Sequence, residues 1–171
     1  MKPFSFISIV DAGIRPADSY GIGTFGASRD GGTRSHLGLD FGPIEANKQV
    51  IAPCDCEYSR RGYSYRSGIG GAGSDEPYEL IELETSFFRI KILYVKPYGF
   101  VKGEKIRCGQ AIGVTQDLSR RYPKDKAHPL GINNHVHFEL IPVGLFVLPH
   151  EGHIDRDNLR INPELFFWSR D

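Results

Sequence analysis

Two short segments of this sequence contain histidine and aspartate at the spacing expected of metal ligands. Residues two apart in a β-strand point to the same side of a sheet, so His135 and His137 in HVHFEL would project together. By the same rule His36 and Asp40 in HLGLDF share one side, and Gly38 between them leaves space for a metal or another chain segment. Two imidazoles and one carboxylate suit zinc, with a fourth tetrahedral position open to water. A histidine beside the metal could accept a proton from that water.

Each of these residues, taken alone, also has a simpler interpretation as a polar strand residue with an ordinary partner. Glu139 alternates onto the same side as the two histidines of its segment, where it either orients a ligand histidine or is a charge at the rim. His128, in a long polar loop, could reach the site, but a solvated loop side chain is the simpler expectation. His150 and His153 have no third ligand nearby in the sequence and are expected at the surface.

The composition is that of one globular domain rich in β-structure. The chain has 171 residues, of which 40% are hydrophobic, 20 are glycine and 11 are proline. Lys+Arg and Asp+Glu balance at 21 each, which disfavours binding to nucleic acid. No apolar run is long enough to span a membrane, and the N-terminus has no clear secretory signal. We therefore expect a single domain over residues 1–171, with no nucleic-acid partner and no membrane span.

Alternating apolar residues predict the strands that must position the histidines. Residues 4–10 are expected to form a first strand, and YELIELE and FFRIKILYVKP to pair as a half-buried hairpin. An N-terminal loop region, 11–35, and a long polar loop, 116–134, lead into the two ligand segments. Glycine-rich residues 67–77 are expected to be a flexible hairpin tip. The C-terminal tail, 144–171, is expected to end in a short helix in NPELFFW whose aromatic residues pack on the body of the domain.

Three cysteines are too few for a disulfide framework. For Cys54, Cys56 and Cys108, buried reduced thiols are the simpler expectation. A bridge from Cys54 or Cys56 to Cys108 stays open if the protein works outside the cell.

Four blocks of the sequence carry a resemblance to a known family. SHLGLDFG, VIAPCDCEY, VKGEKIRCGQAIG and HVHFEL occur in the order and spacing of the lysostaphin-type zinc endopeptidases (peptidase family M23), over about residues 30 to 141. The resemblance implies a compact antiparallel β-sheet with a zinc-containing groove, and zinc held by His36, Asp40 and His137. It also implies that His135 is a catalytic residue beside the metal. Members of the family mostly cut the peptide cross-links of bacterial peptidoglycan.

One departure from the family pattern bears directly on catalysis. The family usually has a second catalytic histidine sixteen residues before the glutamine of its GQ dipeptide, and counting back from Gln110 gives Tyr94. In this respect the chain resembles the leukocyte cell-derived chemotaxins, which are similar to the peptidases, keep the zinc and are thought to act by binding partners. A tyrosine hydroxyl can still donate a hydrogen bond to an oxyanion, but with a pKa near 10 it is a poor general base.

These observations lead to one preferred function and one alternative. The preferred function is a zinc metallo-endopeptidase that acts on peptidoglycan stem peptides or cross-bridges, with His135 as base at a zinc-bound water and Tyr94 as oxyanion donor. The alternative is a catalytically silenced zinc-binding module that recognises a peptide, glycan or protein partner. A wall-cutting enzyme acts outside the cell or in the periplasm, so without a clear signal peptide we expect delivery by a phage particle or a specialised secretion machine, or a leader that has been removed.

Overall fold

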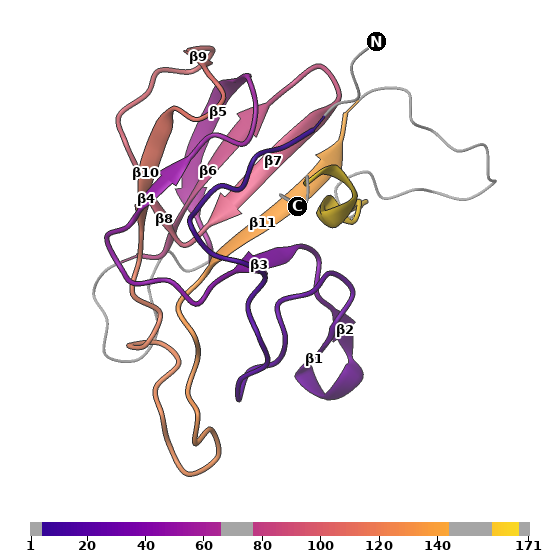
Figure 1. Ribbon diagram of the computed structural model, residues 1–171, viewed down its shortest axis with the longest axis vertical. Coiled ribbons are helices and arrows are strands. Elements are labelled where there is room, and N and C mark those ends of the chain that lie inside the picture. The colour runs from indigo at the N-terminus through magenta and orange to yellow at the C-terminus, as the bar shows by residue number, and fades with distance from the viewer. Residues whose placement is uncertain (1–4, 66–76, 144–158, 168–171) are drawn as a thin grey trace, which may run out of the picture.

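The computed structural model describes residues 5–65, 77–143 and 159–167, and these residues form mainly β-structure and loops (Figure 1). Two short 3-10 helices are present among them, η1 (Asp30–Gly32) and η2 (Pro163–Phe166). The strands, in chain order, are β1 (Ser28–Arg29), β2 (Arg34–Ser35), β3 (Leu39–Phe41), β4 (Gln49–Ile51), β5 (Cys56–Tyr63), β6 (Glu79–Glu84), β7 (Phe88–Leu93), β8 (Val95–Pro97), β9 (Lys105–Ile106), β10 (Ala111–Thr115) and β11 (Val136–Pro142). Neither helix of the described residues has the length and apolar character needed to cross a membrane.

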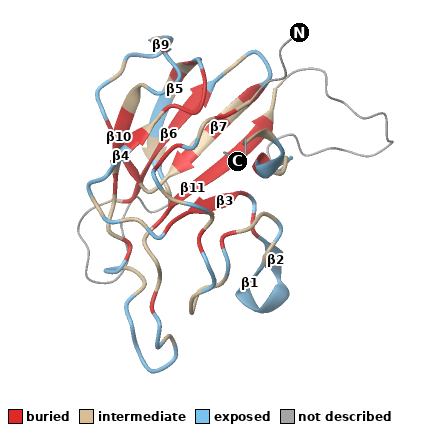
Figure 2. Ribbon diagram, in the orientation of Figure 1, coloured by how far each residue is buried: buried red, intermediate tan, exposed pale blue. Residues whose placement is uncertain are grey.

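The strands pair antiparallel in three sheets, so the predicted all-β fold is confirmed. The largest sheet has the strand order β3-β11-β7-β6-β5-β9, the second has the order β4-β10-β8, and β1 and β2 form a small ribbon. Buried side chains of the two larger sheets belong to one hydrophobic core. Figure 2 shows these buried residues concentrated along β3, β7 and β11, whereas the β1–β2 ribbon is exposed.

The two sides of the large sheet differ in chemistry because side chains alternate along each strand. On one side, Ile81, Ile92 and Phe138 lie in register across β6, β7 and β11, and each is fully buried. Burial of an aliphatic or aromatic side chain of this size contributes about 1.5–3 kcal/mol. One residue further along each strand, Glu82 lies opposite Lys91, which in turn lies opposite Glu139 on β11. One side of β11 therefore packs in the hydrophobic core, and the other side can present polar, functional side chains.

The prediction of a first strand over residues 4–10 is wrong for the part that the structure describes. Among residues 5–10, Phe6 makes an isolated bridge to Phe167, and no continuous strand pairing is formed. Phe6 and Ile9 are nevertheless buried in the core, and the Ile51 N–H donates to the Ile9 carbonyl oxygen at 2.9 Å. The apolar alternation thus reflects burial of a segment that lies over the core and forms backbone hydrogen bonds only intermittently.

The predicted short C-terminal helix is present as η2. The Asn162 side-chain oxygen accepts a hydrogen bond from the Glu164 N–H at 3.0 Å, and proline occupies the first helical position, as is common at helix starts. The ring centroids of Phe166 and Phe167 lie 5.8 and 5.5 Å from that of Phe6. The aromatic residues of the tail therefore pack on the body of the domain as expected.

Other expectations have mixed outcomes. The N-terminal loop region, 11–35, also contains the β1–β2 ribbon and η1, which the sequence pattern did not indicate. Cys54 and Cys56 are buried free thiols as expected, whereas Cys108 is exposed. Residues 67–76 of the predicted hairpin tip (67–77) lie outside the described residues, as do residues 144–158 of the tail, with His150 and His153.

Candidate metal centre

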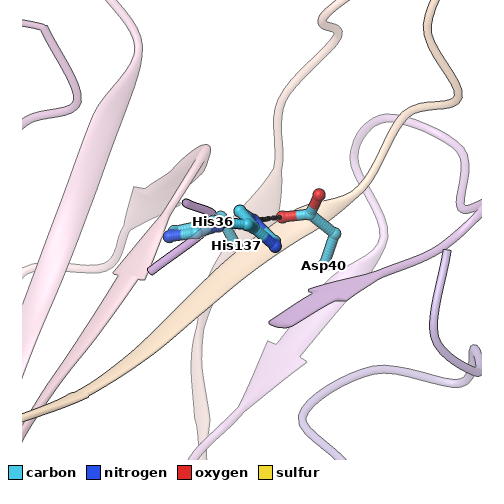
Figure 3. A group of neighbouring side chains, drawn as sticks. All are labelled: His36, Asp40 and His137. Atoms are coloured by element: carbon cyan, nitrogen blue, oxygen red, sulfur yellow. Dashed lines mark hydrogen bonds and ion pairs between the residues drawn. The ribbon is translucent and has the colours of Figure 1, made fainter. Parts of the chain in front are cut away.

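Three side chains from two distant segments of the sequence converge on one point (Figure 3). Asp40 on β3 lies directly opposite His137 on β11 in the antiparallel register, so both side chains project from the same side. His36 precedes β3, and its backbone is held by hydrogen bonds with Gly26 and Ala27. The His36 Nε2 atom lies 3.1 Å from Asp40 Oδ1 and 3.0 Å from His137 Nδ1, and the last two atoms are 2.8 Å apart. The structure therefore brings together the three predicted ligands.

A glycine allows this close approach of β3 to β11. A Cβ atom added at Gly38 would lie 2.2 Å from the Phe138 carbonyl oxygen and 2.9 Å from His137 Cε1. Both distances are too short for any residue with a Cβ at position 38, and the backbone of Phe138 cannot move aside as a flexible side chain could. The space that Gly38 leaves is therefore used by another chain segment.

The partners of the two imidazoles decide which nitrogen atoms carry protons. His36 Nδ1 lies 2.8 Å from the Thr24 carbonyl oxygen, which can only accept, so Nδ1 is protonated and Nε2 presents a lone pair. His137 Nε2 lies 3.2 Å from Glu139 Oε1, so Nε2 donates to this carboxylate and Nδ1 presents a lone pair. Partners of this kind orient the imidazoles that bind metals in proteins. The role of Glu139 in orienting a histidine, one of the two interpretations given above, agrees with this contact.

The arrangement of lone pairs fits a zinc ion. With these tautomers, two nitrogen lone pairs and an ionised carboxylate oxygen face one another at about 3 Å, an arrangement that is repulsive without positive charge between them. Tetrahedral zinc with bonds of about 2.0–2.1 Å places its ligand atoms about 3.3 Å apart, close to the distances seen here. The donor set, two imidazole nitrogens and one carboxylate oxygen, is also one that zinc accepts.

The titration of these groups reflects the same clustering of negative charge. Burial disfavours the charged form of His137, but its contacts with Asp40 and Glu139 outweigh burial and raise its pKa to about 9. Burial also disfavours ionisation of Glu139, yet the hydrogen bond from His137 and the charge of Arg160 lower its pKa to about 2. In the metal-free protein, a proton on His137 thus supplies the positive charge that a zinc ion would otherwise supply.

Two further residues predicted to take part in catalysis lie beside the three ligands. His135 Nε2 is 3.7 Å from Asp40 Oδ1, and His135 Nδ1 donates to the Asn133 carbonyl oxygen at 2.7 Å, which leaves a lone pair on Nε2. Burial lowers the pKa of His135 to about 4 against the opposing attraction of Asp40, so the ring is neutral at pH 7. The ring of Tyr94 packs edge-to-face on His135, with 5.4 Å between centroids. Both residues line a groove of about 620 Å³ that also contains the three ligands.

Sequence reasoning missed a buried arginine that holds the aspartate ligand. Arg15, 2% exposed, donates from Nε and Nη2 to Asp40 Oδ2 at 3.2 and 2.9 Å, so Asp40 Oδ1 is left for the metal. Arg15 also pairs with Asp18, which accepts a hydrogen bond from the Asn133 N–H at 2.8 Å. Because the Asn133 carbonyl oxygen orients His135, one chain of contacts joins the aspartate ligand to the candidate base. No spacing rule points to an arginine in a loop, so the sequence carried no signal for it.

Loop residues complete the walls of the groove. His128 stacks on Tyr20 with 4.3 Å between ring centroids and 8° between ring planes, and both line the groove. The structure thus places His128 on the groove wall, where the sequence favoured a solvated side chain. Tyr122, which lies edge-to-face with Tyr20, also lines the groove.

Comparison with known proteins identifies the fold. No family model and no curated protein matches the chain, but solved structures do. LytU aligns with a TM-score of 0.55 and 16% identity over 84% of this chain and 80% of its own. The catalytic domain of the antimicrobial peptidase lysostaphin from Staphylococcus simulans aligns with a TM-score of 0.52 and 18% identity over 84% of this chain and 87% of its own. The chain has a lysostaphin-like fold.

A third similar structure is that of Csd3 from Helicobacter pylori, with a TM-score of 0.54 and 16% identity over 97% of this chain. The alignment spans 35% of the Csd3 chain, so this protein corresponds to about one third of that larger molecule. At these identities the comparisons establish the fold, and the function must be argued from the site itself.

Proposed function

We propose that this protein is a zinc-dependent endopeptidase that acts on the stem peptides or cross-bridges of bacterial peptidoglycan. The observation that carries the proposal is the convergence of three possible ligand atoms, from His36, Asp40 and His137, beside a neutral His135 in an open groove. A structural zinc site is usually closed by four protein ligands, whereas three ligands with a fourth position facing a groove suit catalysis.

Each residue of the site has a distinct role in this proposal. Zinc, when bound, supplies Lewis acidity and lowers the pKa of a coordinated water. His135 accepts a proton through Nε2, because Nδ1 is already committed to the Asn133 carbonyl oxygen. Tyr94 donates a hydrogen bond from its hydroxyl to the oxyanion that forms at the scissile carbonyl. Arg15 fixes the carboxylate of Asp40 by donating two hydrogen bonds to its second oxygen, Oδ2.

The groove can admit a peptide alongside this constellation. It is open to solvent, and its lining includes the stacked rings of Tyr20 and His128 and two arginines of the β1–β2 ribbon, Arg29 and Arg34. Peptidoglycan lies outside the cytoplasm, so the proposal places the activity outside the cell or in the periplasm.

Tyr94 supports a second candidate function, a silenced zinc module that binds a peptide, glycan or protein partner. It stands where the resembled peptidases carry a second catalytic histidine, and it is a poor base at neutral pH. In the chemotaxin-like resemblance the same substitution accompanies partner binding. The two candidates share the zinc site and differ in whether Tyr94 supports turnover.

One experiment separates the two candidates. Release of soluble fragments from purified peptidoglycan sacculi is measured with zinc, with a chelator, and after zinc is restored, for the wild type, His135→Ala and Tyr94→His. Tyr98→His is the matched control, since Tyr98 is an exposed tyrosine outside the groove. Zinc-dependent release that is lost in His135→Ala, while that variant still binds stoichiometric zinc, supports the peptidase.

The other outcomes are equally informative. Stoichiometric zinc without release in the wild type, followed by release in Tyr94→His but not in Tyr98→His, supports the silenced module. A wild type that binds no zinc contradicts both candidates.

A further inference from the structure

The hydroxyl group of Tyr94 lies at one end of a row of phenols that come from three separate segments. Tyr65, just after β5, lies with its hydroxyl oxygen 3.2 Å from that of Tyr94. Tyr122, in the loop 116–134, lies with its hydroxyl oxygen 2.7 Å from that of Tyr65. The guanidinium carbon of Arg121 sits 3.7 Å from the centre of the Tyr65 ring, and Arg121 Nε is 3.4 Å from the Tyr122 hydroxyl oxygen.

The donors and acceptors in this row run in one direction. The Tyr65 hydroxyl donates to Tyr94, and since a phenol has a single proton, the contact between Tyr65 and Tyr122 must be donated by Tyr122. Arg121 has donors only, so its Nε can only give a hydrogen bond to the Tyr122 oxygen. Tyr94 is therefore the final acceptor of the row. Within the described residues, its own hydroxyl proton has no acceptor.

The backbone at Tyr94 is held in an unusual conformation that aims this ring at the site. Tyr94 has a φ of 66°, in the left-handed region that residues other than glycine seldom occupy. Hydrogen bonds from the Tyr94 N–H to the Glu79 carbonyl oxygen, at 2.8 Å, and from the Gln116 N–H to the Tyr94 carbonyl oxygen, at 3.0 Å, fix it there. Strain of this kind persists where the surroundings enforce it, and it is concentrated at functional sites.

We propose that Arg121, Tyr122 and Tyr65 form a one-way chain of hydrogen bonds that leaves the Tyr94 proton free to be donated into the groove, to an oxyanion beside the metal. The inference rests on the proposed function for its catalytic meaning. Tyr65 acts as a positioning residue: it does not itself line the groove, and its hydroxyl lies between two residues that do, donating to Tyr94 and accepting from Tyr122. The cation over the Tyr65 ring polarises the chain toward Tyr94.

The test uses inorganic phosphate as a tetrahedral oxyanion and measures its binding to the zinc-loaded protein by titration calorimetry. The proteins are the wild type, Tyr65→Phe, Tyr94→Phe and the double variant. Tyr78→Phe is the matched control: its hydroxyl donates to the Asp117 carbonyl oxygen, and its ring packs on the same cluster without belonging to the chain. Zinc stoichiometry is measured for all five proteins, so that a damaged metal site is recognised.

We expect Tyr65→Phe and Tyr94→Phe each to weaken phosphate binding by about 3- to 10-fold, as for the loss of one hydrogen bond. The double variant should bind no more weakly than Tyr94→Phe, because Tyr65 acts only through Tyr94. Tyr78→Phe should bind as the wild type does. In peptide cleavage, Tyr65→Phe should lower kcat with little change in KM.

The inference is overturned if all five proteins bind phosphate equally, if none binds it, or if the effects of Tyr65→Phe and Tyr94→Phe simply add. Failure of this inference can be told apart from failure of the proposed function.

If the effects of Tyr65→Phe and Tyr94→Phe on phosphate binding are coupled but no fragments are released from sacculi, the hydrogen-bond chain is supported and the peptidase is contradicted. Release from sacculi without coupling supports the peptidase and contradicts the chain.

Discussion

The affinity of the site for zinc should rise strongly between pH 7 and pH 9, a range in which a site with an unperturbed histidine changes little. In the proposed site zinc would bind His137 through Nδ1, so the proton that the metal-free protein holds there must leave. Its pKa is raised to about 9, with burial opposing and the contacts to Asp40 and Glu139 prevailing. Below that pH, each unit of acidification should therefore weaken zinc binding by up to tenfold, or about 1.4 kcal/mol. Above it, the affinity should level off.

The expected magnitude follows from the fraction of His137 that is deprotonated. With a pKa of about 9, this fraction rises about fifty-fold between pH 7 and pH 9, whereas for an unperturbed histidine with a pKa near 6.5 it rises by less than about 1.5-fold. His135, with a pKa of about 4, and Glu139, with a pKa of about 2, keep one charge state over this range and add no slope.

The assay is competition against a chromophoric zinc chelator at half-unit steps from pH 6 to pH 10, corrected for titration of the chelator and for hydroxide binding by zinc. Glu139→Gln provides the internal comparison, because loss of this anionic partner should lower the pKa of His137 and shrink the dependence between pH 7 and pH 9. An apparent affinity that is flat from pH 7 to pH 9 in the wild type would refute the argument that a proton occupies the site in place of the metal.

Two substitutions test the framework around the site. Arg15→Met removes the buried cation that pairs with both Asp18 and Asp40, and we expect a loss of about 3–5 kcal/mol in the free energy of unfolding, measured by urea denaturation of the metal-free protein. Arg34→Met, which breaks an exposed ion pair, should cost less than about 1 kcal/mol, and equal losses in the two variants would contradict the assigned role of Arg15. Gly38→Ala should weaken zinc binding and destabilise the fold by about 1–3 kcal/mol, since its Cβ would collide with the backbone of β11. Gly99→Ala, where a Cβ meets nothing within 4 Å, is its control, and a Gly38→Ala protein with unchanged zinc affinity would count against the close approach of the two strands.

The part of the site that lies on strands could be predicted from the sequence. The period of two in HVHFEL placed His137 and Glu139 on one side and the core residues on the other, and the β11 register bears this out. Asp40 was predicted by the same alternation, and the structure sets it directly opposite His137. The same alternation also predicted His36, but His36 precedes β3 and is not on a strand; backbone hydrogen bonds with Gly26 and Ala27 hold it at the cluster.

The contacts made by loops could not be predicted in this way. Arg15, Tyr20 and Tyr122 lie in segments without apolar periodicity, and their positions depend on partners more than a hundred residues away or on hydrogen bonds between loops. The prediction of a first strand was wrong for a related reason. Phe6 and Ile9 are apolar because they cover the core, and a buried segment shows the same apolar alternation as a strand even when it has no continuous backbone pairing with a neighbouring strand. Periodicity reports which side of a segment is buried, and it does not report which partner supplies its hydrogen bonds.

Asp18 shows why the two loops matter to a site whose ligands are mostly on strands. It is buried, it pairs with Arg15, and it accepts the Asn133 N–H, so it joins the N-terminal loop region to the loop that precedes β11. On one side of this junction Arg15 fixes the carboxylate of Asp40, and on the other the Asn133 carbonyl oxygen selects the tautomer of His135. A displacement of either loop would therefore move the aspartate ligand and the candidate base together. The strands bring the ligands close to one another, and this buried ion pair sets how the base is placed relative to them.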